Sequence, residues 1–234
     1  RNGRDMAEKL KALIVGSNSD IGNAVVKELA GKYDIYTISR KKSKSPTHFQ
    51  VENYSKDEVE KVYFEFKNKV GKLDVLIIMN GFGKSGKITE IPLDEIESMV
   101  QANLLVPYYF LHYFTRIFLE NNDGRVVLIG SVAGIKYSPN YAMYSATKFA
   151  IRAIAEAYRN EYQNQNIRIT NIQPGFVETK FWDEFGPNNS KLDFDKRISI
   201  HPKELAELIE YAVENKGSKF TINEITCRSI YQER

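Results

Sequence analysis

The sequence predicts a single α/β domain, a doubly wound three-layer sandwich built around a mostly parallel seven-stranded sheet. Short apolar segments alternate with amphipathic helical segments along the whole chain, and this alternation is typical of right-handed βαβ units. The chain has 234 residues, of which 42% are hydrophobic, and this length and composition suit one domain with a large core. A glycine-containing turn also joins the first apolar segment directly to the first helical one.

The first third of the chain contains three of the predicted strands. Residues 11–15 are apolar and end at Gly16, as expected for a buried parallel strand. A helix over residues 20–30 follows, because apolar side chains recur there at helical spacing. Residues 34–39 form the second predicted strand, and residues 48–51 form a short third one.

The middle of the chain continues the alternation. Apolar residues three and four apart predict a helix over residues 55–70, and the apolar run 73–79 predicts a central strand. A long helix is expected between residues 92 and 119. Pro107 should bend it, because proline lacks the donor and clashes with the preceding turn. Turn residues then precede a fifth strand over residues 125–129.

The last third completes the pattern. Residues 142–163 and 202–215 have helical spacing, and residues 167–172 and 219–226 are the sixth and seventh predicted strands. The segment 181–197 is irregular, aromatic and charged, and we interpret it as a mobile loop or lid that shapes a substrate pocket. Its aromatic side chains suit an apolar pocket wall or simple packing anchors. They are Phe181, Trp182, Phe185 and Phe194.

Composition and charge argue against several classes of function. The formal net charge of +3 is too weak to indicate nucleic-acid binding. Cys227 is the only cysteine, and the three histidines lack ligand spacing, so we expect neither an intrachain disulfide nor a metal site.

No targeting or anchoring feature is predicted. No apolar run approaches the length that crosses a bilayer, and no signal-peptide core precedes the first strand. We therefore expect a cytoplasmic protein that binds no membrane. Residues 1–6 are interpreted as a leader, with Met6 as a natural start, and residues 7–234 as the domain.

The turn between the first strand and the first helix is a candidate phosphate site. Backbone N–H groups at such a turn and the helix N-terminus stabilise a pyrophosphate, and glycines allow its close approach. An ordinary turn without a ligand stays open as the alternative. The predicted cofactor-binding residues there are Gly16, Ser17, Asn18, Ser19, Asp20, Ile21 and Gly22.

The end of the second strand indicates which nicotinamide cofactor would bind. An acidic residue at this place would hydrogen-bond the adenosine ribose and repel a 2′-phosphate, but the chain has Ser39 and Arg40 there. The planar guanidinium of Arg40 can pair with a phosphate, which favours NADP(H) over NAD(H). A solvated basic loop is the alternative interpretation.

Two residues four apart on the helix over 142–163 suggest acid–base chemistry. Tyr144 and Lys148 share one helix face, and a nearby ammonium favours the phenolate, so we expect the pKa of Tyr144 to be lowered. Taken alone, this spacing also fits an ordinary amphipathic helix. Ser131, directly after the fifth strand, adds a hydroxyl at the strand ends where doubly wound sheets bind ligands.

Together these motifs resemble the classical short-chain dehydrogenase/reductase family. Asn103, Ser131, Tyr144 and Lys148 match its catalytic set in order and spacing. The resemblance implies a Rossmann-type fold and hydride transfer between NADP(H) and a carbonyl or secondary alcohol. It implies that Ser131 positions the substrate oxygen and Tyr144 is the general acid/base. Lys148 would lower the tyrosine pKa and bind the nicotinamide ribose, and Asn103 would hold a water in the proton relay.

The resemblance assigns further cofactor contacts. The Pro-Gly-x-x-x-Thr segment after the sixth strand implies that the Val177 backbone and the Thr179 hydroxyl bind the nicotinamide carboxamide. Glu52 resembles the family's adenine-flanking residue. With Tyr144 and Lys148, the remaining predicted contacts are Glu52, Asn80, Gly81, Pro174, Gly175, Val177 and Thr179.

The chain departs from the family pattern at two places. Asp20 replaces the middle glycine of the phosphate turn, where it could cap the helix. Ile78 and Met79 replace two asparagines that usually tie the central sheet together, a loss that Asn80 could partly make good. These departures motivate an alternative function, a catalytically weak or inactive nucleotide-binding or regulatory protein.

Other expectations follow from the resemblance. The partner would be a small-molecule carbonyl or alcohol, and the chain would form a homodimer or homotetramer through its long helices. The apolar stretch 108–114 suits such an interface or a buried helix. An epimerase or methyltransferase of the same fold class is disfavoured, because it does not require the spacing of Ser131, Tyr144 and Lys148.

Overall fold

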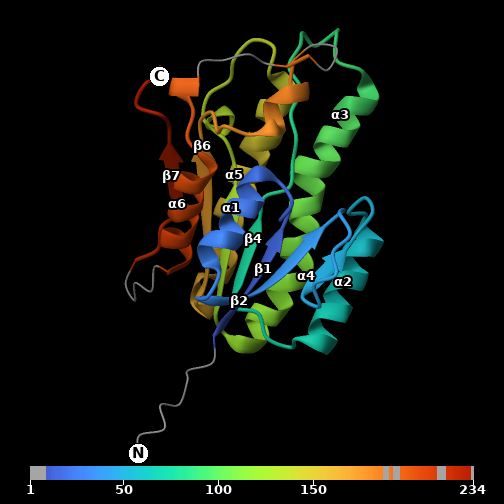
Figure 1. Cartoon of the computed structure of the whole chain (residues 1–234), viewed down its shortest axis with the longest axis vertical. Helices are drawn as coiled ribbons and strands as arrows, with labels where there is room; N and C mark the ends of the chain where they lie inside the picture. Colours follow the sequence, from blue (N-terminus) through green and yellow to red (C-terminus); the bar gives the residue numbers. More distant parts are fainter. Residues whose placement is uncertain (1–8, 187–189, 192–195, 215–219, 233–234) are drawn as a thin grey trace, which may run out of the picture.

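The computed structural model has the predicted doubly wound α/β architecture (Figure 1) and describes residues 9–186, 190–191, 196–214 and 220–232. Seven parallel strands form one sheet in the order β3-β2-β1-β4-β5-β6-β7. The strands are β1 (Leu10–Val15), β2 (Tyr33–Ser39), β3 (His48–Gln50), β4 (Val75–Ile78), β5 (Gly124–Ile129), β6 (Ile167–Pro174) and β7 (Glu224–Cys227).

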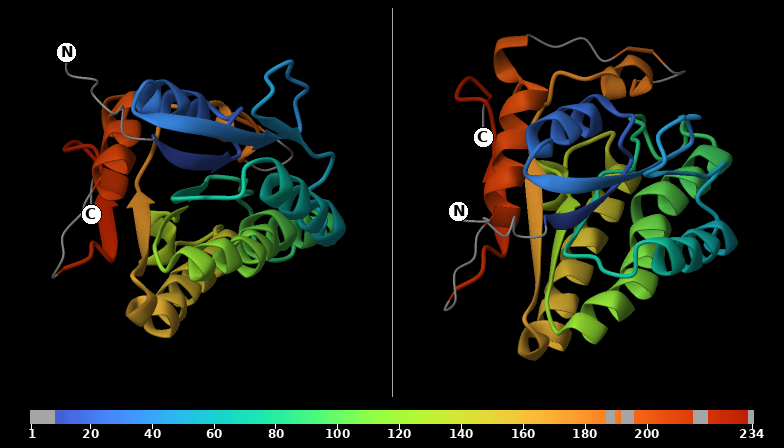
Figure 2. Two further views of the ribbon diagram at one scale, coloured as in Figure 1. Left: turned by 90° about the horizontal axis from the view of Figure 1, so that it is seen from below. Right: turned by 60° about the horizontal axis from the view of Figure 1, so that its bottom comes forward.

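Helices cover both faces of the sheet, as the two views of Figure 2 show. One face packs on α1 and α6, and the other packs on α2, α4 and α5. The helices are α1 (Asp20–Leu29), α2 (Lys56–Lys69), α3 (Leu93–Val100), α4 (Val106–Asn121), α5 (Ala142–Tyr162) and α6 (Pro202–Glu214).

The sheet is buried on both sides, which explains why its strands are continuously apolar rather than alternating. In β1, Leu13 faces one core cluster and Ile14 the other, and neither is exposed to solvent. The larger cluster contains a group of aromatic rings between α2 and α4, including Phe66, Phe110 and Phe114. Most of the apolar stretch 108–114 is therefore buried inside the domain, although Tyr108 is 53% exposed.

The long helix predicted after Pro92 is interrupted by a π-helical segment, Gln101–Leu105, which separates α3 from α4. Pro107 is the second residue of α4, so the position without a donor directly follows the π-helical segment, where the hydrogen-bond pattern of the helix changes. Such π-helical insertions are frequent at functional sites, and this one contains Asn103.

Two predicted boundaries were wrong. The seventh strand begins at Glu224 rather than residue 219, which lies outside the described residues. Just before it, β6 makes two hydrogen bonds, one from the Thr170 hydroxyl to the Ile222 carbonyl at 2.7 Å and one from the Asn171 nitrogen to the Asn223 carbonyl at 3.0 Å. The segment predicted to be irregular from residue 181 begins as a 3₁₀ helix, Lys180–Glu184, and residues 1–6 and Phe194 are not among those described.

The part of the chain that the structure describes lacks two features. No helix in that part of the chain is long and apolar enough to cross a membrane. Nor do its histidine, cysteine, aspartate and glutamate side chains form a group of three that could hold a metal ion.

Candidate active site

The predicted site residues gather at the carboxyl ends of the central strands. The sheet order reverses at β1, which pairs with β2 on one side and β4 on the other. In open parallel sheets, ligands bind at such a reversal, outside the carboxyl ends of the strands. The phosphate turn follows β1, Asn80 follows β4, and Ser131 follows β5.

The phosphate turn requires its two glycines. Gly16 has φ +82°, and a Cβ there would lie 3.0 Å from the backbone nitrogen of Asn80. A Cβ on Gly22 would lie 2.4 Å from the carbonyl oxygen of Gly16. The strand, turn and helix are thus packed too closely for any side chain at either position.

Ser19, not Asp20, caps the first helix, which corrects the role expected of the aspartate. The Ser19 hydroxyl oxygen accepts a hydrogen bond from the Gly22 nitrogen at 2.9 Å. Asp20 is the first helical residue, and its Oδ2 accepts a hydrogen bond from the backbone nitrogen of Lys180 at 2.8 Å. The carboxylate therefore links the phosphate turn to the segment that follows Thr179.

The end of β2 is connected to the phosphate turn. Asn18 Nδ2 donates a 2.8 Å hydrogen bond to the hydroxyl of Ser39, which is buried. Arg40 is exposed directly beyond it. Glu52 is exposed after β3, and its backbone nitrogen donates to the carboxylate of Glu58 at 2.7 Å.

The end of β4 shows how the chain manages without the family's asparagine pair. Ile78 packs in one core cluster and Met79 packs against the other, so apolar contacts on both faces hold this strand. Asn80 Nδ2 donates to the Ala102 carbonyl, as expected for a partial replacement, while its buried Oδ1 has no hydrogen-bond partner in the described structure.

Asn103 is buried and fully engaged by its neighbours. Its Oδ1 accepts from the Phe82 nitrogen at 2.9 Å, and its Nδ2 donates to the Phe82 carbonyl at 2.8 Å and to the Thr147 hydroxyl at 3.1 Å. A Cβ on Gly81 (φ +147°) would lie 2.8 Å from Asn103 Oδ1 and 3.9 Å from Lys148 Nζ. The side chain thus joins the loop after β4 to α5, close to the lysine, and its predicted place in a water relay stays a prediction.

Ser131 and Tyr144 line the same pocket. The Ser131 hydroxyl accepts a 3.1 Å hydrogen bond from the Ala133 nitrogen. The Tyr144 ring contacts Phe181 in the 3₁₀ segment and Phe185 directly after it, with ring centroids 5.9 and 5.5 Å away. Burial raises the pKa of Tyr144 to about 12, an effect that the hydrogen bond with Ser131 partly opposes.

Lys148 lies behind the tyrosine and not in hydrogen-bond contact with it. Its Nζ is 5.8 Å from the centre of the Tyr144 ring and donates to the Ile129 carbonyl at 3.0 Å. Burial lowers the pKa of Lys148 to about 8. The expected lowering of the tyrosine pKa is therefore absent here, because loss of solvation dominates both groups.

The segment after β6 is held by its own hydrogen bonds. The Trp182 indole donates to the Val177 carbonyl at 2.8 Å, and the Phe181 nitrogen donates to the Thr179 hydroxyl at 3.3 Å. The Pro174-Gly175 turn lies against the chain end, since the Gly175 nitrogen donates to the Cys227 carbonyl at 2.8 Å.

Several residues of this region were not predicted from the sequence, and three of them have long polar or charged side chains. Gln232 Oε1 accepts from the Phe176 nitrogen at 3.2 Å, and Lys136 and Arg228 line the pocket. They come from segments with no motif, and only the sheet order brings the end of the chain beside β6.

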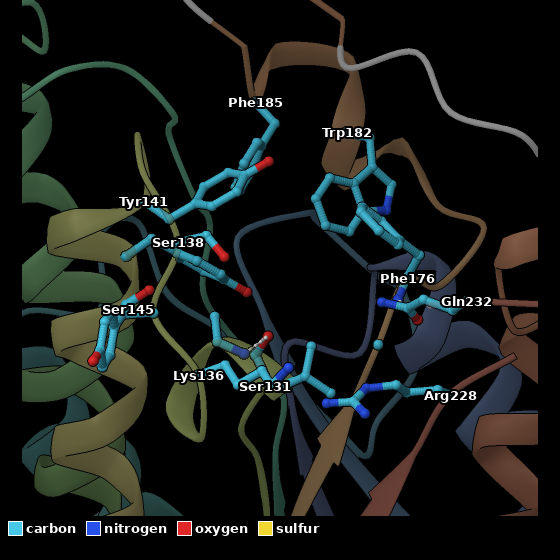
Figure 3. Close-up of a pocket in the computed structure, with 15 residues that line it drawn as sticks. Ser131, Lys136, Ser138, Tyr141, Ser145, Phe176, Trp182, Phe185, Arg228 and Gln232 are labelled. Carbon is cyan, nitrogen blue, oxygen red and sulfur yellow. Dashed lines mark hydrogen bonds between the residues drawn. The ribbon is translucent and has the colours of Figure 1, made fainter. Parts of the chain in front are cut away.

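The pocket has a volume of about 330 Å³ (Figure 3). Its walls come from the segments after β5, β6 and β7, from the start of α5 and from the 3₁₀ segment. This size is within the range of sites for small metabolites, about 300 Å³ and above.

Known oxidoreductases resemble this chain in sequence. The family model for short chain dehydrogenases matches residues 10–190. An uncharacterized oxidoreductase of Staphylococcus aureus strain MW2 is 27% identical over 232 residues, covering 94% of this chain and 96% of the relative. Another, from Staphylococcus saprophyticus, is 29% identical over 175 residues, covering 75% of this chain and 71% of the relative.

Solved structures share the fold. An alcohol dehydrogenase from Thermococcus sibiricus, complexed with 5-hydroxy-NADP, has a TM-score of 0.83 and 22% identity, covering 97% of this chain and 99% of that one. A serine dehydrogenase from Escherichia coli has a TM-score of 0.82 and 16% identity, covering 96% and 100%. Because the family model matches most of the length of this chain, the chain belongs to the short-chain dehydrogenase/reductase family of oxidoreductases.

Proposed function

We propose that this protein is an NADP(H)-dependent oxidoreductase that interconverts a carbonyl and a secondary alcohol, with Tyr144 as general acid/base. One observation carries the proposal. The side chains of Ser131 and Tyr144 line one pocket, and the Nζ of the buried Lys148 lies over the Tyr144 ring, 5.8 Å from its centre.

The residues present fit a nicotinamide dinucleotide. Gly16 and Gly22 allow the tight turn between β1 and α1. The backbone nitrogens of Asn18, Asp20 and Ile21 have no acceptor among the described residues and would donate to a pyrophosphate at the start of α1. The buried Oδ1 of Asn80, which has no partner in the described structure, is available to a cofactor hydroxyl. Ser17, Asn18, Ser19 and Ile21 belong to the same turn. The backbone of Val177 and the hydroxyl of Thr179 would hold the carboxamide beside Pro174 and Gly175.

The preference for NADP(H) over NAD(H) rests on Arg40. Its exposed guanidinium follows β2 beside the Asn18–Ser39 hydrogen bond, where a 2′-phosphate would lie. Two fold neighbours, the Thermococcus sibiricus enzyme and the protein ElxO, were solved with NADP-type cofactors. Glu52, after β3, would flank the adenine.

The bound cofactor supplies or accepts the hydride, and the chain's own residues handle the oxygen and the proton. Ser131 would hold the substrate oxygen by a hydrogen bond, next to the Tyr144 hydroxyl. Tyr144 would donate its proton to that oxygen during reduction and take it back during oxidation. Lys148 would stabilise the phenolate by its charge, with Asn103 fixing the loop beside it.

Further parts of the proposal concern the whole protein. Residues 7–234 would form one domain, and the protein would act in the cytoplasm as a homodimer or homotetramer.

The test replaces Tyr144 by phenylalanine. Tyr144→Phe should lose nearly all turnover with a panel of ketones and aldehydes, while NADPH still quenches the fluorescence of Trp182, the only tryptophan. Tyr141→Phe is the matched control, because Tyr141 lines the same pocket without a proposed role in proton transfer. Full activity of Tyr144→Phe would disprove the assignment.

A second candidate function is an NADP(H)-binding regulatory protein with little activity. The high pKa of Tyr144 and the carboxylate of Asp20 at the phosphate turn favour it. NADPH binding by the wild-type protein without turnover of any carbonyl in the panel would select this candidate.

A further inference from the structure

The pocket has two chemically different ends. Aromatic rings line one end, including Tyr141, Trp182 and Phe185, and the side chains of Lys136 and Arg228 lie at the opposite end in Figure 3. Lys136 and Arg228 are its only charged lining residues in the described part of the chain. The chain as a whole has 33 basic and 30 acidic residues, so this positive character is local.

The fold fixes the position of Arg228. The residue directly follows β7, whose last residue, Cys227, is paired with Pro174 of β6. The Gly175 nitrogen also donates to the Cys227 carbonyl at 2.8 Å. The backbone of Arg228 is therefore anchored beside the turn that would hold the nicotinamide.

Arg228 is a partly buried residue, and its guanidinium has no anionic partner in the described part of the chain. Within the described residues it makes no hydrogen bond or ion pair, whereas Arg152 and Arg159 nearby on α5 are paired with Glu224 and Glu156. A guanidinium has five donors in a fixed fork that matches a carboxylate or phosphate. Taking such a cation partly out of water is unfavourable unless an anion compensates it.

We infer that the substrate has an anionic group, a carboxylate or a phosphate, which Arg228 binds with support from Lys136. Its apolar or aromatic part packs against the rings at the other end of the pocket. The reacting carbonyl lies between them, at Ser131 and Tyr144. This inference rests on the proposed function and narrows its substrate to anionic oxo and hydroxy compounds of a size that fits about 330 Å³.

The first experiment compares matched substrates in steady state at saturating NADPH. The acids 2-oxo-4-phenylbutanoate and 4-oxo-4-phenylbutanoate are compared with their methyl esters, and phenacyl phosphate is compared with 2-hydroxyacetophenone. Wild-type kcat/KM should favour at least one anion over its neutral partner by about 10-fold to 100-fold, the usual strength of a charge-assisted hydrogen bond. The favoured pair shows whether the anion is a carboxylate or a phosphate.

The variants locate the source of this preference. Arg228→Gln should remove most of the preference and leave kcat/KM for the neutral partner within about threefold, while Arg228→Lys should retain part of it. Lys136→Gln should have a smaller effect, because Lys136 is exposed. Lys61→Gln, which removes one charge from the exposed side of α2, is the control and should change nothing.

A binding experiment is independent of turnover. Calorimetry of the NADPH complex should show that the unreactive acid 4-phenylbutanoate binds at least about 10-fold more tightly than 4-phenylbutanamide, and that Arg228→Gln removes the difference. If the acid preference appears without turnover of any carbonyl, Arg228 binds an anionic ligand in this pocket and the proposed oxidoreductase function fails.

Two results would overturn the inference. One is that the wild-type protein has the same kcat/KM for anionic and neutral substrates and binds the acid and the amide with the same affinity. The other is a loss of NADPH affinity in Arg228→Gln with an unchanged acid preference, which would assign Arg228 to the cofactor instead.

Discussion

The carboxylate of Asp20 accepts a hydrogen bond from the backbone nitrogen of Lys180, 160 residues further along the chain. The bond joins the first helical residue after the phosphate turn to the start of the 3₁₀ segment whose rings contact Tyr144. A glycine at position 20 could not make it. The aspartate therefore places a negative charge beside the proposed pyrophosphate site and at the same time holds one wall of the pocket.

Asparagine at position 20 separates these two effects. Asp20→Asn keeps an acceptor for the Lys180 nitrogen and removes the charge, so NADPH should bind roughly fivefold more tightly, corresponding to about 1 kcal/mol of removed repulsion. Titration of Trp182 fluorescence with NADPH measures this affinity. Asp20→Ala also loses the hydrogen bond and should lower the free energy of unfolding by about 1 kcal/mol. Unchanged or weaker NADPH binding by Asp20→Asn would contradict the idea that its charge opposes the cofactor.

A substitution of Gly22 tests where the cofactor binds. In Gly22→Ala the new methyl group would lie 2.4 Å from the Gly16 carbonyl oxygen, so the phosphate turn must shift. NADPH affinity should fall at least about 10-fold, because the backbone N–H groups lose their arrangement. Gly31→Asn is the control, since that glycine has open space around it and a φ of +84°, which asparagine tolerates. An unaffected NADPH affinity in Gly22→Ala would place the cofactor elsewhere.

Arg40 tests the choice between the two cofactors. Arg40→Ala should weaken NADPH binding about 10-fold or more, because the guanidinium no longer pairs with the 2′-phosphate, and should leave NADH binding nearly unchanged. Parallel titrations with both dinucleotides measure the ratio. Lys44→Ala is the control, since it removes another exposed charge from the same loop. An equal loss of affinity for NADPH and NADH would show that Arg40 does not bind the 2′-phosphate.

The sequence was sufficient for the parts of this protein that depend on local pattern. The strands, the phosphate turn and the spacing of Ser131, Tyr144 and Lys148 follow from apolar runs, glycines and helical periodicity. The partner of Asp20 could not be predicted, because a hydrogen bond between residues 160 positions apart has no sequence signal.

The pKa values of the proposed catalytic pair could not be predicted from the sequence either. Spacing on a helix correctly put Tyr144 and Lys148 on one face, but their pKa values depend on how much solvent the surrounding segments exclude. The place of Arg228 in the pocket could not be predicted either, because it depends on the pairing of β7 with β6.

The buried ammonium of Lys148 makes a prediction about stability and pH. Burial lowers its pKa from 10.5 to about 8 in the folded protein, so between about pH 8 and 10.5 the unfolded chain binds more protons than the folded one. In this pH range, Lys148 should therefore make the free energy of unfolding rise with pH, by at most about 1.4 kcal/mol per pH unit. Below pH 8 the lysine is charged in both states, and its destabilising effect is constant and fully present.

Lys148→Met isolates this contribution, because methionine fills similar space without a charge. Urea unfolding of the cofactor-free protein at pH 7.5 and pH 9.5 should show a larger gain in stability between the two pH values for the wild type than for Lys148→Met. The variant should also be the more stable of the two at pH 7.5. Tyr144 does not interfere, since its pKa of about 12 lies above the window, and its own effect, a loss of stability with rising pH, begins only near pH 10. The same pH dependence in both proteins would mean that Lys148 is solvated in the folded protein and keeps its ordinary pKa.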